Sequence, residues 1–167
     1  ETTQPEYGAE NGVKEVVEIP VGYDGLTIAQ IKGATPLSLT REQVYLALAK
    51  QIPKKNGEES LIDNPNKLWS DIDKSLPATK IEVMGPPPSS GTRDSFVELT
   101  LEYGCKSYSW LEALEKIDKD DFAKKCKSIR EDGAYIEAGE NDNLIVQKLT
   151  ASKNLLGVFG YSFLEEN

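Results

Sequence analysis

Segments with strand periodicity alternate with segments of helical periodicity along most of this chain, and this alternation restricts the fold more than any other feature. Strand patterns are predicted at Lys80–Gly85, Ala134–Ala138 and Leu155–Tyr161. Amphipathic helical patterns separate them. Such alternation is typical of an α/β fold in which helices cover a mixed or parallel sheet. We therefore predict a single α/β domain over residues 1–167, a length sufficient to bury an ordinary core.

The clearest helix is predicted around a capping-box pattern. Thr40 and Gln43 have the spacing of such a box, and apolar residues follow at helical intervals until Pro53. Further helical patterns are Arg93–Tyr103, Trp110–Ile117, Asp120–Arg130 and a helix that holds Leu144, Ile145 and Leu149, capped by Asn141 or Asp142. Two other regions are predicted as strand, turn and strand at Ile19–Ala29, and as a polar surface loop at Lys54–Asn66.

Charge and residue content exclude several classes of protein. Lys and Arg total 19 against 28 Asp and Glu, so the formal net charge is −9, and such a surface repels nucleic acid and anionic membranes. The chain has no His and only two Cys, which excludes zinc clusters and His-dependent catalytic triads. No apolar run approaches the roughly 20 residues of a membrane span. No signal-peptide pattern opens the chain, so we expect a soluble polypeptide from which any export signal was removed.

The two cysteines, Cys105 and Cys126, leave two alternatives open. A disulfide between them would close a short loop and stabilise the fold by about 3 kcal/mol in the chain-entropy model. Two reduced cysteines in the core are equally compatible with the residues alone. Cys126 lies on the apolar face of its predicted helix, which suits either state.

A short hydroxyl-rich loop is the strongest candidate for a binding site. Pro86–Pro88 ends a predicted strand, and the chain then enters a helix through Ser90, Gly91 and Thr92. The hydroxyls are donors, the glycine lets the backbone approach a ligand, and the helix N-terminus presents N–H groups aligned with the helix dipole. Arg93 can donate to two oxygens of a phosphate. We call Ser90–Arg93 the SGTR loop and predict that it binds an oxyanion.

A plainer interpretation of the same loop is a helix cap. Ser89, Ser90 and Thr92 would then cap the helix, Arg93 would be solvated, and Asp94 would interact favourably with the helix dipole. The acidic net charge does not decide between the two, because helix N-termini and backbone N–H groups bind anions locally.

The wider sequence resembles the PstS family of periplasmic phosphate-binding proteins. The SGTR loop, followed by Asp94-Ser95-Phe96, is similar to the Ser-Gly-Thr-Arg phosphate loop of that family. Further segments that match, in the family's order, are Tyr23–Ile28, Leu39–Gln43, Trp69–Ile72, Gly133–Glu137 and Leu156–Leu164. One departure is that some members place an Arg a few residues before this loop, where this chain has Pro86–Pro88. Arg93 would then have to supply the guanidinium.

This resemblance implies a fold and a function. The fold would be one lobe of a type II periplasmic binding protein, here the second lobe, excised near the hinge at both ends. The intact protein would be the periplasmic, monomeric receptor of a high-affinity phosphate ABC importer, with no enzyme activity and no cofactor. Phosphate would lie between the lobes, held from this side by Ser90, Gly91, Thr92 and Arg93. Lobe closure would signal the membrane permease, and a periplasmic location favours the disulfide.

The missing first lobe would complete the site. In the family it contributes a hydroxyl, backbone amides and an Asp that accepts the phosphate proton, so this chain would supply half of the site and bind weakly alone. Two alternatives are a structural or interaction module with a vestigial anion loop, and a phosphoryl-transfer enzyme fragment that uses Asp94 as a base.

Other polar and aromatic residues are interpreted as structural. Glu137, Glu140 and Asp142 cluster near a glycine but lack the EF-hand spacing, so no metal site is predicted. Tyr135 and Tyr161 fall within strand patterns and are predicted to be half-buried packing residues.

Overall fold

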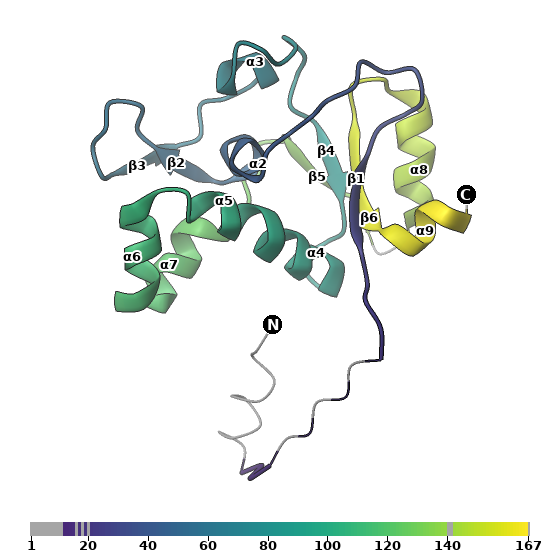
Figure 1. The fold of residues 1–167 in the computed structure, drawn as a ribbon. Helices are drawn as coiled ribbons and strands as arrows, with labels where there is room; N and C mark the ends of the chain where they lie inside the picture. The colour runs from purple at the N-terminus through teal and green to yellow at the C-terminus, as the bar shows by residue number, and fades with distance from the viewer. Residues whose placement is uncertain (1–11, 16, 18, 20, 140–141, 167) are drawn as a thin grey trace.

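The computed structural model describes residues 12–15, 17, 19, 21–139 and 142–166. Its main sheet has the strand order β1-β6-β4-β5 and consists of β1 (Leu26–Ala29), β4 (Val83–Gly85), β5 (Tyr135–Glu137) and β6 (Leu156–Gly160). β4 is parallel to both β5 and β6, whereas β1 is antiparallel to β6. The sheet is therefore mixed, and helices lie on both of its sides (Figure 1). The predicted α/β fold is confirmed.

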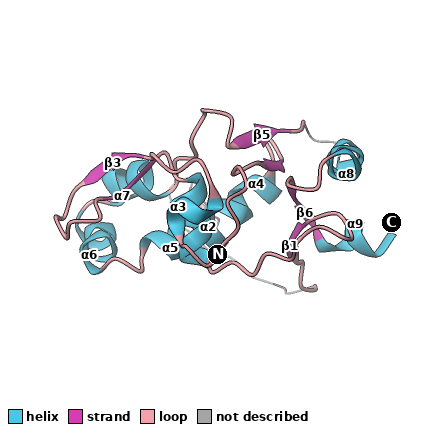
Figure 2. Ribbon diagram, turned by 90° about the horizontal axis from the view of Figure 1, so that it is seen from above, coloured by secondary structure: helices cyan, strands magenta, loops and turns pink. Residues whose placement is uncertain are grey.

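The two faces of the sheet bury different clusters. On one face α8 (Asp142–Ala151) covers a small cluster made of Met84, Ala138, Ile145, Leu149, Leu155 and Phe159. On the other face α2 (Arg41–Leu48) and α4 (Gly91–Phe96) enclose the larger core. Figure 2 shows α8 and the α2–α4 group on opposite sides of the strands. The strands thus lie between two apolar layers, which explains why their sequences are mostly apolar.

The SGTR loop opens a long helical run. α4 continues without interruption into a π-helical segment, η1 (Val97–Glu102), and then into α5 (Tyr103–Cys105). The predicted helix Arg93–Tyr103 is therefore confirmed and extends to Cys105. Gly104 permits its close packing against α2, because a Cβ there would lie 2.5 Å from the carbonyl oxygen of Arg41.

α2 begins as predicted but ends earlier. The hydroxyl of Thr40 accepts from the Gln43 N–H (3.1 Å), and the Gln43 side chain accepts from the Thr40 N–H (2.9 Å), so the capping box is present. The helix ends at Leu48, well before Pro53. The predicted extension to Pro53 is wrong because tertiary hydrogen bonds take the last carbonyls of the helix.

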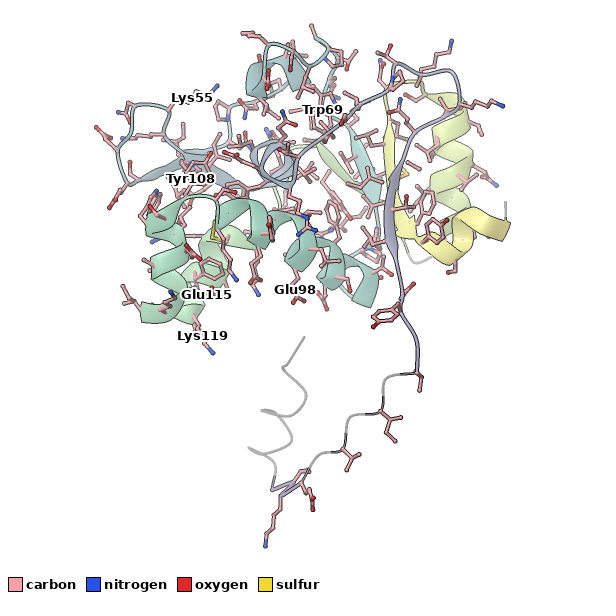
Figure 3. All side chains as sticks on the ribbon, viewed as in Figure 1. Lys55, Trp69, Glu98, Tyr108, Glu115 and Lys119 are labelled. Atoms are coloured by element: carbon pink, nitrogen blue, oxygen red, sulfur yellow. A yellow bond between two sulfur atoms is a disulfide. The ribbon has the colours of Figure 1, made fainter. Side chains whose placement is uncertain are left out.

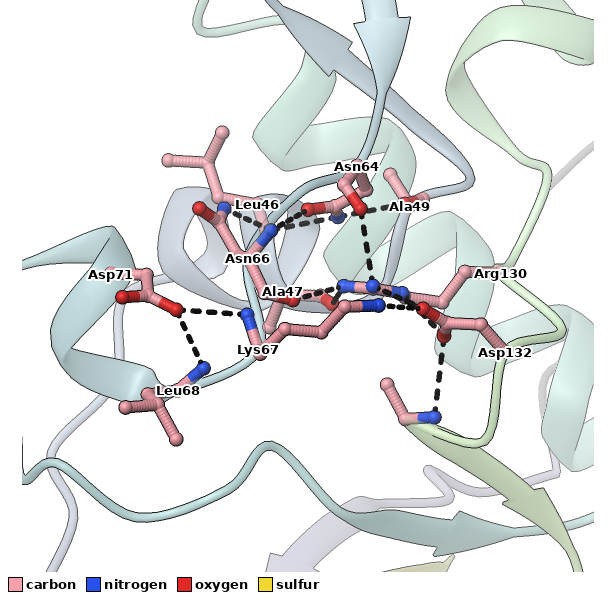
Figure 4. Close-up of polar contacts among 11 residues, drawn as sticks. Leu46, Ala47, Ala49, Asn64, Asn66, Lys67, Leu68, Asp71, Arg130 and Asp132 are labelled. Carbon is pink, nitrogen blue, oxygen red and sulfur yellow. Dashed lines mark hydrogen bonds and ion pairs between the residues drawn. The ribbon is translucent and has the colours of Figure 1, made fainter.

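These bonds come from two asparagines and one arginine (Figure 4). Nδ2 of Asn64 donates to the carbonyls of Leu46 (2.9 Å) and Ala49 (2.8 Å), and Nδ2 of Asn66 also donates to Leu46 (3.0 Å). Arg130 donates from Nη1 to Ala47 (3.1 Å). The carbonyls that a helix leaves unpaired at its C-terminus are satisfied here by side chains.

Arg130 is the centre of this buried network. Only 4% of the residue is exposed, and its guanidinium also donates to the carbonyls of Asn66 (2.8 Å) and Asn64 (3.2 Å). Nε and Nη2 both donate to the Asp132 carboxylate, with 2.7 Å for the Nε contact. Every guanidinium nitrogen is thus hydrogen-bonded, as a buried charge requires.

The ion pair with Arg130 makes stability depend on pH. The hydrogen bonds from Arg130, with a further one from Lys67, hold the pKa of Asp132 well below its ordinary range. A carboxyl with a lowered folded-state pKa stabilises the fold above its unfolded pKa of about 3.9, and this contribution is lost as pH falls toward the folded value. Between about pH 4 and pH 2, the wild type should therefore lose stability more steeply than Asp132→Asn, as measured by denaturant unfolding at each pH. Parallel pH profiles would contradict this assignment.

Several predicted boundaries need correction. The polar segment predicted as a loop at Lys54–Asn66 contains part of a hairpin of β2 (Gln51–Pro53) and β3 (Leu61–Asp63). Among the described residues, Ile19 and residues 21–25 do not belong to a strand, so the strand predicted before the turn is not found there and β1 begins at Leu26. α7 (Lys119–Cys126) stops before Arg130, which instead turns into the network above. The helices α3 (Trp69–Ile72), α6 (Ser109–Ile117) and α9 (Tyr161–Glu166) complete the fold.

Cys105 and Cys126 form a disulfide that joins α5 to α7, with the Cα atoms 5.6 Å apart (Figure 3). Both residues are fully buried. Beside it, Glu102 forms ion pairs with Lys106 (2.7 Å) and Lys127 (2.6 Å). Burial alone would raise the pKa of Glu102, but the two lysines outweigh it and lower the pKa. The disulfide therefore joins α5 to α7, and the Glu102–Lys127 ion pair joins η1, which runs directly into α5, to the residue that follows α7.

Replacing both cysteines with alanine should lower the free energy of unfolding by about 3 kcal/mol, because the unfolded chain loses a covalent constraint over a separation of 21 residues. Urea unfolding of the wild type with and without reductant gives the matched comparison. A double variant as stable as the oxidised wild type would contradict the expectation.

Candidate functional site

The SGTR loop lies at the carboxyl edge of the sheet. β4, an interior strand between β6 and β5, ends at Gly85, and the chain reaches the N-cap residue Ser90 five positions later. Because β4, β5 and β6 are parallel, their carboxyl ends meet at this edge. Ligands of open α/β sheets bind in the crevice beyond such ends. The topology therefore places the loop where a ligand site is expected.

The hydroxyls of this loop are not used as helix caps. Ser90 occupies the N-cap position with extended φ and ψ of −92° and 131°, yet its side chain makes no capping hydrogen bond. Within the part of the chain that the structure describes, the Thr92 hydroxyl has no hydrogen-bond partner either. Gly91 is exposed, and a Cβ at that position would meet open space. The Ser90 and Thr92 hydroxyls therefore lie beside an approachable backbone, and Ser90 does not cap α4 with its side chain.

Arg93 lies half-buried on the side of α4 that faces β5. Its guanidinium carbon sits 4.3 Å from the ring centroid of Tyr135, a cation–π geometry. Nη1 donates to the carbonyl oxygen of Pro86 at 3.2 Å. The guanidinium is therefore held beside the loop instead of extending into solvent, and its remaining N–H groups can serve an acceptor.

Tyr135 is the site residue that the sequence interpretation missed. It is buried, with 6% of the residue exposed, so it packs more deeply than the half-buried position predicted, and it also contacts Arg93 of the loop directly. Its hydroxyl donates to the Pro86 carbonyl at 2.9 Å, the same oxygen that Arg93 contacts. No sequence signal joins these residues, because they meet only through the pairing of Val83 in β4 with Tyr135 in β5.

Gly85 provides the space that Tyr135 occupies. A Cβ on Gly85 would lie 2.4 Å from the Tyr135 hydroxyl oxygen and 3.2 Å from Cβ of Val158. Gly85→Ala is therefore expected to displace the ring and to lower the free energy of unfolding by about 1 to 3 kcal/mol, as overpacked cores do. Thermal unfolding checks this, with Gly91→Ala as the control because its Cβ meets open space. Equal stability of both variants would show that the ring can move without cost.

The edge that carries the loop also brings together β1 and β6. Leu26, the first residue of β1, pairs with Gly160, the last residue of β6, and the Tyr161 N–H donates to the Gly25 carbonyl at 2.7 Å. Tyr161 is 49% exposed and is the first residue of helix α9 (Tyr161–Glu166), so the prediction that it lies within a strand is wrong.

A cavity of about 440 Å³ adjoins Arg93. It is lined by Pro88, Arg93, Asp94, Val97, Glu98 and Lys127. Asp94 is exposed, so its carboxylate is open to solvent. The cavity joins the base of the SGTR loop to the end of α7, and it offers space beside the guanidinium.

In the described ranges, no group of three or more His, Cys, Asp or Glu side chains could hold a metal ion. Glu140 and Asn141 lie outside the described residues, so the cluster and the cap that include them are not described. Across the same part of the chain, no helix is both long and apolar enough to cross a membrane.

Comparison with known proteins identifies the family. The family model of the PBP superfamily domain matches residues 2–167. The chain belongs to this superfamily. The match extends over almost the full chain, so the sheet edge and the SGTR loop both lie within the PBP domain.

Curated relatives in this superfamily are longer than the chain. It is 29% identical over 152 residues to the phosphate-binding protein PstS of Staphylococcus haemolyticus, and 26% identical over 151 residues to protein SphX of Synechococcus elongatus. Each match covers 90% of this chain and 34% of the relative. The PBP domain thus spans about a third of the length of these relatives.

Solved structures show the same relation. A possible phosphate binding protein from Planctomyces limnophilus superposes with a TM-score of 0.57 and 26% identity, over 99% of this chain and 46% of that protein. PstS from Borrelia burgdorferi superposes with a TM-score of 0.52 and 19% identity, over 86% and 43% respectively, which is a likeness of fold. The chain spans less than half of either structure.

Proposed function

We propose that this PBP domain is one lobe of a two-lobed solute-binding protein, and that its SGTR loop supplies half of a phosphate site. The PstS of Staphylococcus haemolyticus named above is a phosphate-binding protein, and this chain covers 34% of its length. A second lobe would account for the remainder. The intact protein would deliver phosphate to the membrane permease of an ABC importer, as a monomer in the periplasm.

The observation that supports this proposal is that, in the described part of the chain, hydrogen-bond donors of the SGTR loop lie free or pre-positioned at the carboxyl edge of the sheet. The Ser90 hydroxyl does not cap its helix, and Arg93 is held beside the loop by Tyr135 and Pro86. An oxyanion placed over the N-terminus of α4 would accept from the hydroxyls of Ser90 and Thr92, from the Gly91 N–H and from Arg93. Charge-assisted bonds of this kind are the strong ones in anion recognition.

Groups from the other lobe, facing the carboxyl edge of the sheet, would complete the phosphate site. Only donors are proposed on this side, whereas a protonated phosphate also presents an O–H that needs an acceptor. Asp94 is adjacent, but its side chain is exposed, so we place the acceptor in the other lobe. An unpaired buried acceptor would disfavour sulfate, which carries no such proton at neutral pH. Closure of the lobes would exclude water from the site.

Calorimetric titration tests this function. The full-length protein is expected to bind inorganic phosphate tightly and to prefer it to sulfate, whereas residues 1–167 alone should bind weakly. Absence of binding by both proteins would overturn the proposal and would support an interaction module. Release of phosphate from an ester by the full-length protein would instead indicate an enzyme.

A further inference from the structure

We propose that Tyr135 is a positioning residue for the SGTR loop, which holds the Arg93 guanidinium and the Pro86 carbonyl in the geometry that receives an oxyanion. This inference rests on the proposed function and names the part of the site that acts without touching the ligand. Tyr135 comes from β5, a different element from the loop and its helix.

Two contacts, and the space left by a glycine, fix the Tyr135 ring. Phe96 of α4 stacks against it, with 6.3 Å between ring centroids and 27° between planes. Gly85 leaves room for its hydroxyl, which donates to the Pro86 carbonyl at 2.9 Å. Burial raises the pKa of this hydroxyl, and the nearby Arg93 opposes the rise only in part. The phenol therefore stays protonated at neutral pH and keeps its donor role.

The fixed ring in turn restricts Arg93. The guanidinium lies over the ring face at 4.3 Å, and Nη1 shares the Pro86 carbonyl with the phenol. An arginine side chain otherwise loses considerable rotamer freedom when it binds a ligand. Ordering it before the ligand arrives reduces that cost and so raises affinity.

The loop depends strongly on this single guanidinium. From Pro86 to Arg93 the chain contains no Lys and no Arg other than Arg93 itself. The Pro86 carbonyl would repel an anion if it turned toward the ligand. Tyr135 and Arg93 both donate to this oxygen, which keeps it occupied. Tyr135 thus positions the Arg93 guanidinium, which attracts the anion, and keeps the Pro86 carbonyl, which would repel it, turned away from the ligand.

Titration of the full-length protein with inorganic phosphate tests the inference. Tyr135→Leu should weaken binding by about 3- to 30-fold, the range expected for a cation–π contact. Tyr135→Phe keeps the ring and should fall between the wild type and Tyr135→Leu. In an Arg93→Ala background, Tyr135→Leu should weaken binding less than it does in the wild type, because the part of its role that acts through Arg93 is already lost. Additive losses, or wild-type affinity in both tyrosine variants, would overturn the inference while leaving the proposed function intact.

Tyr103→Leu is the matched control. Tyr103 lies under Arg41 at 4.2 Å, the same kind of pair, but it is 58% exposed and lies outside the SGTR loop. Its removal should leave phosphate affinity unchanged. A loss equal to that of Tyr135→Leu would show a general effect of removing a tyrosine and would overturn the inference.

A second measurement needs no ligand. In the nitrogen NMR spectrum of the full-length protein, the Nε–H of Arg93 should carry a ring-current shift in the wild type and in Tyr135→Phe, and lose it in Tyr135→Leu. If the wild type failed to bind phosphate, the proposed function would fall. The spectrum would still test whether Tyr135 positions Arg93. An unchanged Arg93 signal in Tyr135→Leu would overturn that positioning role.

Discussion

Replacing Arg130 with methionine is expected to lower the free energy of unfolding by about 3 to 5 kcal/mol, because each buried carbonyl left without its donor costs about 1 to 3 kcal/mol. The guanidinium is 4% exposed and donates to the carbonyls of Ala47, Asn64 and Asn66. Methionine fills much of the volume but has no donor, so these carbonyls would remain buried without their partner. Urea unfolding of the two proteins measures the difference.

Lys67→Met is the matched control for this change. Lys67 contacts the same Asp132 carboxylate at 2.6 Å, but its side chain is 66% exposed. An exposed pair of this kind contributes about 1 kcal/mol or less. If Arg130→Met cost no more than Lys67→Met, the buried carbonyl contacts would not be what stabilises the end of α2.

Arg93→Ala should weaken phosphate binding to the full-length protein by about 10- to 100-fold, because a charge-assisted donor would be lost from a dehydrated site. Thr92→Val keeps the shape of the side chain but removes its hydroxyl, and should weaken binding by about 10-fold. Calorimetric titration measures both losses. Neither residue is part of the buried core, so the fold should remain intact, and far-ultraviolet circular dichroism checks this.

Arg41→Ala serves as the control for the arginine variant. Arg41 also lies over a tyrosine ring, but it begins α2 and has no contact with the loop described above. Its removal should change phosphate affinity little beyond a small loss of positive charge. Unchanged affinity in both Arg93→Ala and Thr92→Val would leave the SGTR loop as a helix terminus with no role in binding.

Local patterns predicted the elements near the site well. The alternation of strand and helix periods led to the mixed sheet, and the prolines after Gly85 marked the end of β4. The Thr40 capping box required only residues within one helical turn, and both of its hydrogen bonds are present. Each of these features depends on neighbours within a few positions, so the sequence contains all the information needed.

Errors arose where distant segments supply the hydrogen bonds. Pro53 was expected to end α2, but the helix ends at Leu48 because Asn64, Asn66 and Arg130 take its final carbonyls. Arg130 was placed in a helix because its apolar neighbours continued the helical spacing. A local pattern does not show which carbonyls a side chain will reach in the folded protein.

The sequence by itself determined the α/β class, the capped helix and the position of Ser90, Gly91, Thr92 and Arg93 at a helix N-terminus, because periodicity and capping are local. Only the tertiary structure decided that β5 lies beside β4. This pairing brings Tyr135 under Arg93 and both against the Pro86 carbonyl. Sheet order depends on the burial of whole elements against one another, so it is set by contacts between residues about 50 positions apart.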